Sequence, residues 1–170
     1  TAWNATLNGM KYVNMALLQI AGVDLSASAA WDFGLCIRLS YIYTYEYIKK
    51  GEPLTSSTRP HTATARIAYT KRCKDHSFNI TLNGRLLSKV TYDEYTSLTD
   101  YTQTEKVTYP AYTIWNLSFQ YMWNAISINT TINNLFNYVP KYYYSNSPFT
   151  TGTTFSVGLS LNIEKFFNKK

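Results

Sequence analysis

Apolar and polar residues alternate along most of the chain, a pattern typical of β-strands whose two faces meet different surroundings. Between Phe33 and Tyr47 every odd position is Phe, Leu, Ile or Tyr, whereas the even positions include Arg38, Ser40 and Glu46. The same alternation recurs over residues 23–31, 63–70, 78–86, 115–123, 126–136 and 155–164. The sequence therefore predicts an all-β protein of seven strands, each with one apolar and one polar face.

The connections between these strands alternate in length. Short ones are expected near Asp32, between Arg72 and His76 and at Asn124, and long ones over residues 49–60, 92–110 and 139–152. Tight turns at one end and long loops at the other are typical of an antiparallel up-and-down transmembrane β-barrel. No run approaches the ~20 apolar residues of a membrane-spanning helix, so a helical membrane protein is excluded.

The alternation of the first strand becomes regular only after Gly22. Upstream of it the phase slips, because Leu17 and Leu18 are adjacent. A β-bulge at a glycine produces such a slip, and we expect one at Gly22.

Aromatic residues are abundant, with 16 Tyr, 8 Phe and 4 Trp, and many fall at the ends of the predicted strands. Aromatic side chains at both membrane interfaces are a property of transmembrane barrels. We expect a belt beside the short turns, formed by Trp31, Phe33 and Trp123, and a second belt beside the long loops, formed by Tyr45, Tyr47, Tyr92 and Tyr138.

The charge distribution and the small number of Cys and His residues argue against several functional classes. Lys and Arg exceed Asp and Glu by 16 to 10, but the basic residues are scattered, which favours solvated turn charges over nucleic-acid binding. Two cysteines and two histidines provide neither a disulfide scaffold nor a metal site, and we expect no cofactor.

The sequence has no nucleophile elbow, phosphate loop or zinc motif. A barrel hydrolase is the alternative, but His61 and His76 should lie at opposite rims, so we expect no enzyme.

Four motifs, in order, resemble the C-terminal part of TonB-dependent outer-membrane receptors. These are Gly22-Val23-Asp24-Leu25-Ser26, Arg59-Pro60-His61, Ile132-Asn133-Asn134-Leu135-Phe136-Asn137 and the closing strand from Thr154 to Leu161. The resemblance covers essentially the whole chain. It implies a 22-stranded barrel with an N-terminal plug, of which residues 1–170 would be the last seven strands. The absence of an initiator Met and of a signal peptide at Thr1 agrees with this expectation.

The resemblance also implies a function. The complete protein would capture a scarce nutrient, such as a siderophore, haem, cobalamin or glycan, and import it with energy supplied through TonB. Its partners would be outer-membrane lipid, the upstream strands and plug, the TonB complex and the small nutrient, and its location the bacterial cell outer membrane. A passive porin-like or adhesive barrel is the alternative, and a soluble up-and-down barrel with a packed apolar interior is a third.

Two sets of residues are candidate ligand-binding groups. Arg38, Arg66 and Arg85 fall on the polar faces of three consecutive strands, with Asp24 and Glu46 on the same face. They would either guide an anionic ligand or grip the plug, or form salt bridges in a hydrated lumen, which is the interpretation we favour. The loop tyrosines Tyr95, Tyr101, Tyr142, Tyr143 and Tyr144 would either stack on a sugar, haem or chelate ring or pack within the loops and the aromatic belt.

Overall fold

The computed structural model describes the backbone of residues 2–4, 9–11, 18–48, 58–96, 103–141 and 150–163. The strands are β1 (Ala2–Asn4), β2 (Gly9–Lys11), β3 (Leu18–Ala30), β4 (Leu35–Ile48), β5 (His61–Cys73), β6 (His76–Leu87), β7 (Val90–Tyr95), β8 (Thr104–Tyr109), β9 (Tyr112–Trp123), β10 (Ile126–Asn133) and β11 (Thr154–Leu161). Within these described ranges, no helix is long and apolar enough to cross a membrane.

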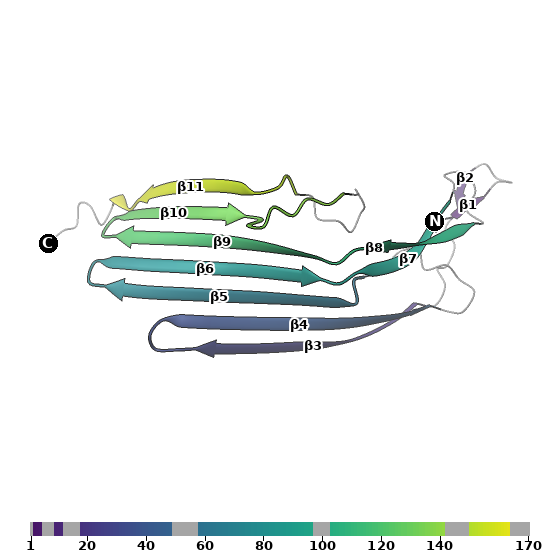
Figure 1. Cartoon of the computed structure of the whole chain (residues 1–170), viewed down its shortest axis with the longest axis horizontal. Helices are drawn as coiled ribbons and strands as arrows, with labels where there is room; N and C mark the ends of the chain where they lie inside the picture. The colour runs from purple at the N-terminus through teal and green to yellow at the C-terminus, as the bar shows by residue number, and fades with distance from the viewer. Residues whose placement is uncertain are drawn as a thin grey trace.

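The main structure is one antiparallel sheet of seven strands in the order β11-β10-β9-β6-β5-β4-β3. The strands lie side by side in a single layer (Figure 1). This arrangement confirms the seven predicted strands. The order follows the chain, except that β7 and β8 lie between β6 and β9 in the sequence and form no part of this sheet. The sheet is not closed: among the described residues, β3 and β11 each have a strand partner on one side only.

Strands β7 and β8 form a separate two-stranded ladder that continues the β6–β9 hairpin. The ladder breaks at Ser88-Lys89 on one side and at Pro110-Ala111 on the other. The long connection expected over residues 92–110 therefore contains paired strands rather than loop alone. Tyr92 lies in this hairpin with 2% of its surface exposed and its ring stacked on that of Tyr109. Its predicted place in a lipid-facing belt is therefore wrong.

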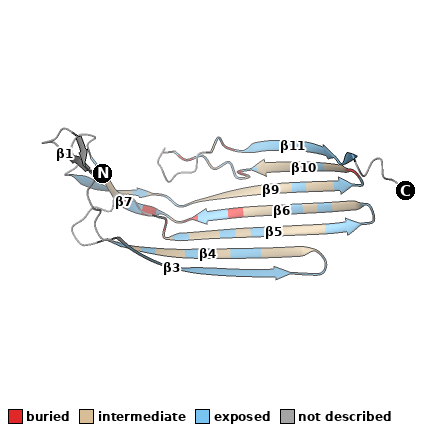
Figure 2. Cartoon of the chain, turned by 180° about the vertical axis from the view of Figure 1, so that it is seen from behind, coloured by how far each residue is buried: buried red, intermediate tan, exposed pale blue. Residues whose placement is uncertain are grey.

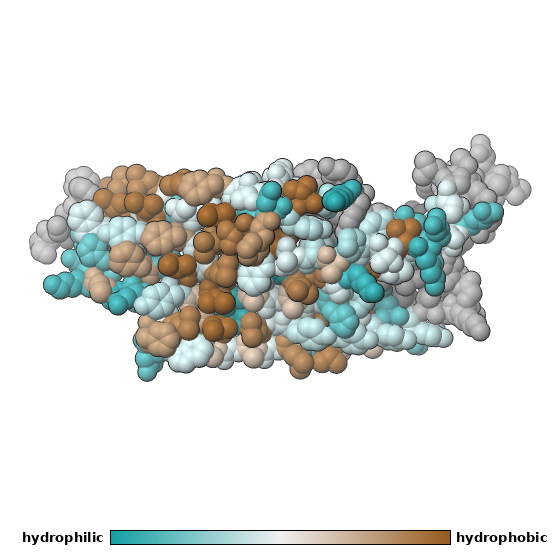
Figure 3. All heavy atoms as spheres, in the orientation of Figure 1, coloured by the Kyte–Doolittle hydropathy of each residue, from teal (hydrophilic) through white to brown (hydrophobic). Residues whose placement is uncertain are grey.

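The strand register places the predicted apolar positions that lie within the strands on one face. Across the sheet, Ile37 pairs with Ile67, Ile67 with Leu82, and Leu82 with Leu117, and the row continues through Ile132 to Phe155. Hydrophobic side chains gather over the middle of the strands on the face seen in Figure 3. The one-residue alternation read from the sequence therefore becomes a continuous apolar surface.

This surface is not covered by any second layer among the described residues. Leu25, Phe155 and Leu159 are 60%, 66% and 67% exposed. In the whole described part of the chain, the only buried hydrophobic side chains are Leu87, Val90, Tyr92 and Ala125. The edge strands β3 and β11 are exposed along their described length, while the inner strands are mostly half-buried (Figure 2). A soluble barrel would bury its apolar face in a core. The exposed face fits a sheet whose outer surface contacts lipid.

The short turns are formed by residues that adopt left-handed backbone conformations. Lys74 and Asn124 begin the two-residue turns after β5 and β9, with φ angles of 49° and 50°, and Gly34 ends the β3–β4 turn at φ 101°. Each turn is bonded to the neighbouring hairpin: the Asn124 amide donates to the Asp75 carbonyl in the next turn at 3.2 Å, and the Thr70 amide of β5 donates to the Gly34 carbonyl at 2.9 Å. The Asn162 amide likewise donates to the Ala125 carbonyl at 2.8 Å. One end of the sheet is therefore a row of tight turns that are hydrogen-bonded to their neighbours, which we call the laced turns.

Gly22 is not the site of a bulge. Residues on both sides of it pair one for one with β4, as Ala21 with Tyr45, Gly22 with Thr44 and Val23 with Tyr43. A Cβ at Gly22 would lie 2.6 Å from the Tyr43 carbonyl oxygen. Close approach of the neighbouring backbone explains the glycine, and the predicted bulge is wrong.

Aromatic side chains gather on the outward face near both ends of the sheet. Trp31 and Phe33 lie 6.2 Å apart at the β3–β4 turn, and Trp123 stacks on His76 at 6.1 Å beside the neighbouring turns. At the other end, Tyr45 and Tyr47 are exposed. These five residues are arranged as two belts would require. Cys36 and Cys73 are both free.

Replacing Gly34 with Ala tests the β3–β4 turn. An added Cβ would lie 1.9 Å from the Thr70 carbonyl oxygen, and φ is positive. We expect the free energy of unfolding to fall by about 1–3 kcal/mol. This fall can be measured by titrating the protein with urea and following the loss of the folded band on gels of unboiled samples. The control is Gly158→Ala, because nothing lies within 4 Å of a Cβ at Gly158. Equal stability of the two variants would contradict the conclusion that the β3–β4 turn requires a glycine at position 34.

Candidate functional site

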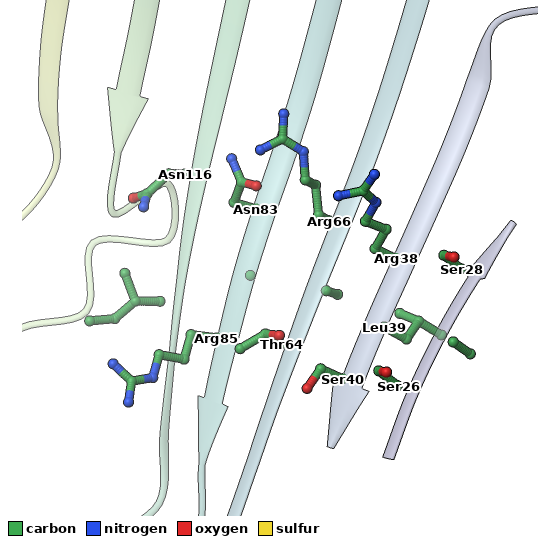
Figure 4. A pocket seen from close by; sticks show the side chains of 14 residues that line it. Ser26, Ser28, Arg38, Leu39, Ser40, Thr64, Arg66, Asn83, Arg85 and Asn116 are labelled. Atoms are coloured by element: carbon green, nitrogen blue, oxygen red, sulfur yellow. The ribbon is translucent and has the colours of Figure 1, made fainter. Parts of the chain in front are cut away.

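A hollow on the polar face of β3, β4, β5, β6 and β9 contains all three predicted arginines (Figure 4). Even-numbered residues of β3, β4, β5 and β9 and odd-numbered residues of β6 reach this face because each strand alternates. Its polar lining residues are Ser26, Ser28, Arg38, Ser40, Thr64, Arg66, Asn83, Arg85 and Asn116. The sheet thus collects basic and neutral polar side chains in one place.

Arg38 and Arg66 are direct partners in the β4–β5 ladder. The same row continues from Arg66 to Asn83 and from Asn83 to Asn116. We call these four residues the arginine row. In Figure 4 the guanidinium of Arg38 is turned toward Arg66, and the Asn83 amide lies on the other side of Arg66. Two positive groups therefore lie side by side without an intervening residue.

Arg85 belongs to the next row of the ladder, where it pairs with Thr64. Its guanidinium points away from the other two in Figure 4. The sequence correctly predicted that Arg85 shares their face. The structure shows that it does not extend the Arg38–Arg66 pair.

None of the three arginines has a carboxylate partner among the described residues. Asp24 lies four residues from Ser28, the ladder partner of Arg38, which is roughly 13 Å along the strand. Glu46 lies roughly 27 Å along β4 from Arg38. Glu46 accepts hydrogen bonds from the Thr58 amide at 3.1 Å and from the Thr58 hydroxyl at 2.6 Å. Neither carboxylate expected beside the arginines pairs with them in the described part of the chain, and the salt-bridge interpretation stays a prediction.

Asn116 is fixed at the end of the arginine row by a distant segment. Its Oδ1 accepts the backbone N–H of Asn134 at 2.8 Å. That contact settles which side-chain atom is the oxygen, so the amide NH2 of Asn116 is left as the donor group. Sequence reasoning missed Asn83 and Asn116, although their alternation phase placed them on the arginine face.

Of the loop tyrosines, only Tyr95 lies in the described part of the chain. It is 41% exposed at the end of β7, in the hairpin that projects beyond the seven-stranded sheet (Figure 1). Tyr101, Tyr142, Tyr143 and Tyr144 lie outside the described residues. The ligand-stacking role of all five stays a prediction.

Arg59 occupies a position whose importance sequence reasoning did not find. It is 7% exposed, and its Nη1 donates to the carbonyls of Ser88 and Pro110, the latter at 2.8 Å. Its guanidinium carbon lies 4.7 Å from the centre of the Tyr112 ring. Ser88 and Pro110 lie on opposite sides of the break between the β6–β9 and β7–β8 ladders. Arg59 therefore clamps the base of the projecting hairpin.

A comparison with models of known protein families matches residues 2–135 to the family described as TonB dependent receptor-like, beta-barrel. The match spans most of the chain and includes the whole arginine row. The chain belongs to this family. No curated protein and no solved structure matched the chain. The family is one of outer-membrane transport receptors of Gram-negative bacteria rather than of enzymes.

Within this receptor barrel, the Asn-Asn-Leu-Phe-Asn motif ends β10 and connects three segments. Asn134 has a φ of 52°, and its side chain donates to the Tyr138 carbonyl at 2.7 Å and to the Thr150 hydroxyl at 3.0 Å. Its Oδ1 accepts the Tyr138 amide at 2.8 Å. The strand predicted to reach Phe136 stops at Asn133, because Asn134 leaves the extended conformation. The same residue also holds Asn116 in the arginine row.

The described part of the receptor barrel has no group of three or more His, Cys, Asp or Glu side chains placed to hold a metal ion. His61 and His76 begin β5 and β6 at opposite ends of the sheet, as predicted. Tyr41 and Tyr121 form hydrogen bonds to the Nδ1 atoms of His61 and His76 at 2.7 and 2.8 Å. Each histidine is therefore part of an aromatic cluster at its own rim.

Replacing Arg59 with Ala tests the clamp on the receptor's projecting hairpin. Loss of the guanidinium leaves the Ser88 and Pro110 carbonyls without their buried donor, and hydrogen bonds to charged groups are the stronger ones. We expect hydrogen–deuterium exchange of the β7 and β8 amides to rise by about tenfold or more. Lys89→Ala, an exposed neighbour, is the control and should leave exchange unchanged. Unchanged exchange in Arg59→Ala would show that the hairpin does not depend on the clamp.

Proposed function

We propose that the chain forms part of the wall of an outer-membrane receptor that imports a scarce nutrient with energy supplied through TonB. The observation that carries the proposal is the two-faced sheet, apolar outside and polar inside, in a chain of the TonB-dependent receptor family. The nutrient belongs to the classes that such receptors take, namely siderophores, haem, cobalamin and glycans.

The open edges of the sheet support a role as one segment of a larger barrel. β3 and β11 each present one unpaired edge among the described residues. Unpaired backbone groups are not tolerated in a bilayer. We infer that further strands of the same polypeptide pair with them in a 22-stranded barrel around a plug, with residues 1–170 as its C-terminal seven-stranded segment. Outer-membrane lipid, the plug, the TonB complex and the nutrient are then the partners.

A passive porin-like or adhesive barrel is the second candidate, because it would have the same apolar outer face and polar inner face. The two differ in their need for energy. A porin passes solutes down their gradient, whereas a receptor of this family releases its nutrient only when coupled to the inner membrane.

Uptake by cells that lack the full-length gene distinguishes these functions. We expect the deletion strain to grow poorly when one nutrient, drawn from iron chelates, haem, cobalamin and glycans, is supplied at limiting concentration. Growth should recover at high concentration, when passive routes suffice. Removal of the TonB complex from the parent strain should give the same defect, because both changes block the same energised step.

Two controls make the result decisive. Complementation with the intact gene should restore growth, and a protonophore should abolish radiolabelled uptake by the complemented strain. Uptake that depends on the gene but persists without TonB would support the passive barrel and overturn the proposal.

A further inference from the structure

The arginine row carries an inference that rests on the proposed function and extends it. Like charges directly opposite each other in a ladder destabilise the sheet, yet Arg38 and Arg66 occupy this relation. Both side chains are exposed on the polar face. No carboxylate among the described residues neutralises either of them. The pair is therefore a local excess of positive charge that remains uncompensated within the described sheet.

The neighbours of the pair in the ladder are neutral side chains that can donate hydrogen bonds. Asn116, at the end of the row, has its oxygen engaged by the Asn134 amide, which leaves its NH2 group as a donor. Ser28, the ladder partner of Arg38, and Asn83, the ladder partner of Arg66, lie on either side of the pair and can also donate. A group that satisfied these donors would need several acceptor atoms and a negative charge.

We propose that Arg38 and Arg66, with Asn83 beside Arg66 in the same row, bind a carboxylate in the barrel lumen. The planar guanidinium fork matches the two oxygens of a carboxylate, and charge-assisted bonds of this kind are stronger than neutral ones. The carboxylate has two sources with the same chemistry. It belongs either to the transported nutrient or to an acidic side chain of another segment of the receptor.

The test uses the purified full-length receptor in detergent and measures its Tm. Glutarate, a dicarboxylate, is the soluble probe, and sodium chloride at equal ionic strength corrects for screening. The variants are Arg38→Gln and Arg66→Gln. Arg72→Gln is the matched control, because Arg72 is an exposed arginine on the same face of β5 whose ladder partner is Ser77.

If the carboxylate comes from solution, glutarate should raise the Tm of the wild type and of Arg72→Gln by roughly 2 °C. The rise should be lost in Arg38→Gln and in Arg66→Gln. If the carboxylate belongs to the receptor, glutarate should change nothing, and both substitutions should lower the Tm by roughly 2 °C or more. Arg72→Gln should then match the wild type.

The proposal is overturned if Arg38→Gln and Arg66→Gln behave like Arg72→Gln in both measurements, or if they raise the Tm by relieving repulsion. The assay involves no transport, so it is independent of the uptake test. A receptor with the expected Tm response but no TonB-dependent uptake would lose the proposed function and keep the site. Uptake without any Tm response would do the reverse.

Discussion

Backbone hydrogen bonding in a medium without water is the constraint on which the rest of this structure depends. A strand that crosses hydrocarbon must pair every amide and carbonyl with a neighbouring strand, because an unpaired group there costs several kcal/mol. Long strands in unbroken one-for-one register meet that requirement, as in the thirteen-residue β3 against β4. Side-chain packing has a secondary role: a single layer buries little, and the described residues contain few buried hydrophobic side chains. Lipid on one face and water on the other take the place of a core.

The same constraint explains where polar chemistry can lie. Charged side chains are costly on the lipid face and inexpensive on the hydrated one, so alternation directs Arg38, Arg66 and Arg85 to a single surface. The ladder then decides which of them meet. Arg38 and Arg66 are opposed because β4 and β5 are in that register, whereas Arg85 is one row away and turned aside. In the β-barrel of the matched family, the surface opposite the lipid-facing one is the lumen side, so these residues line the lumen.

Much of the fold could be predicted from the sequence, because a period of two and the spacing of turns are local signals. The strands, their faces and the tight turns at Lys74 and Asn124 follow from them. The failures arose where the cause lies on another strand. Position 22 is a glycine because the Tyr43 carbonyl lies close beside it. Tyr92 is buried because it lies in the β7–β8 hairpin, whose short strands lack a regular alternation of apolar and polar residues.

The candidate site was predicted in part for the same reason. Alternation was sufficient to place the arginines on one face, but it could not give the register that pairs two of them or the side-chain direction that separates the third. Arg59 was out of reach, because its carbonyl partners lie 29 and 51 residues away in sequence. The contact between Asn116 and Asn134, 18 residues apart, was hidden similarly.

The laced turns make the two ends of the sheet differ in how neighbouring hairpins are held together. Bonds from Thr70 to Gly34, from Asn124 to Asp75 and from Asn162 to Ala125 oppose sliding of one hairpin past the next, so shear at that rim must break them before any strand shifts. At the opposite end the β7–β8 hairpin is held at its base by Arg59 and by the hydrogen bonds between Ser88 and His61. The turn rim of the described sheet is therefore cross-linked from hairpin to hairpin, and a slip in register between neighbouring hairpins has to break these bonds as well as those of the strand ladders.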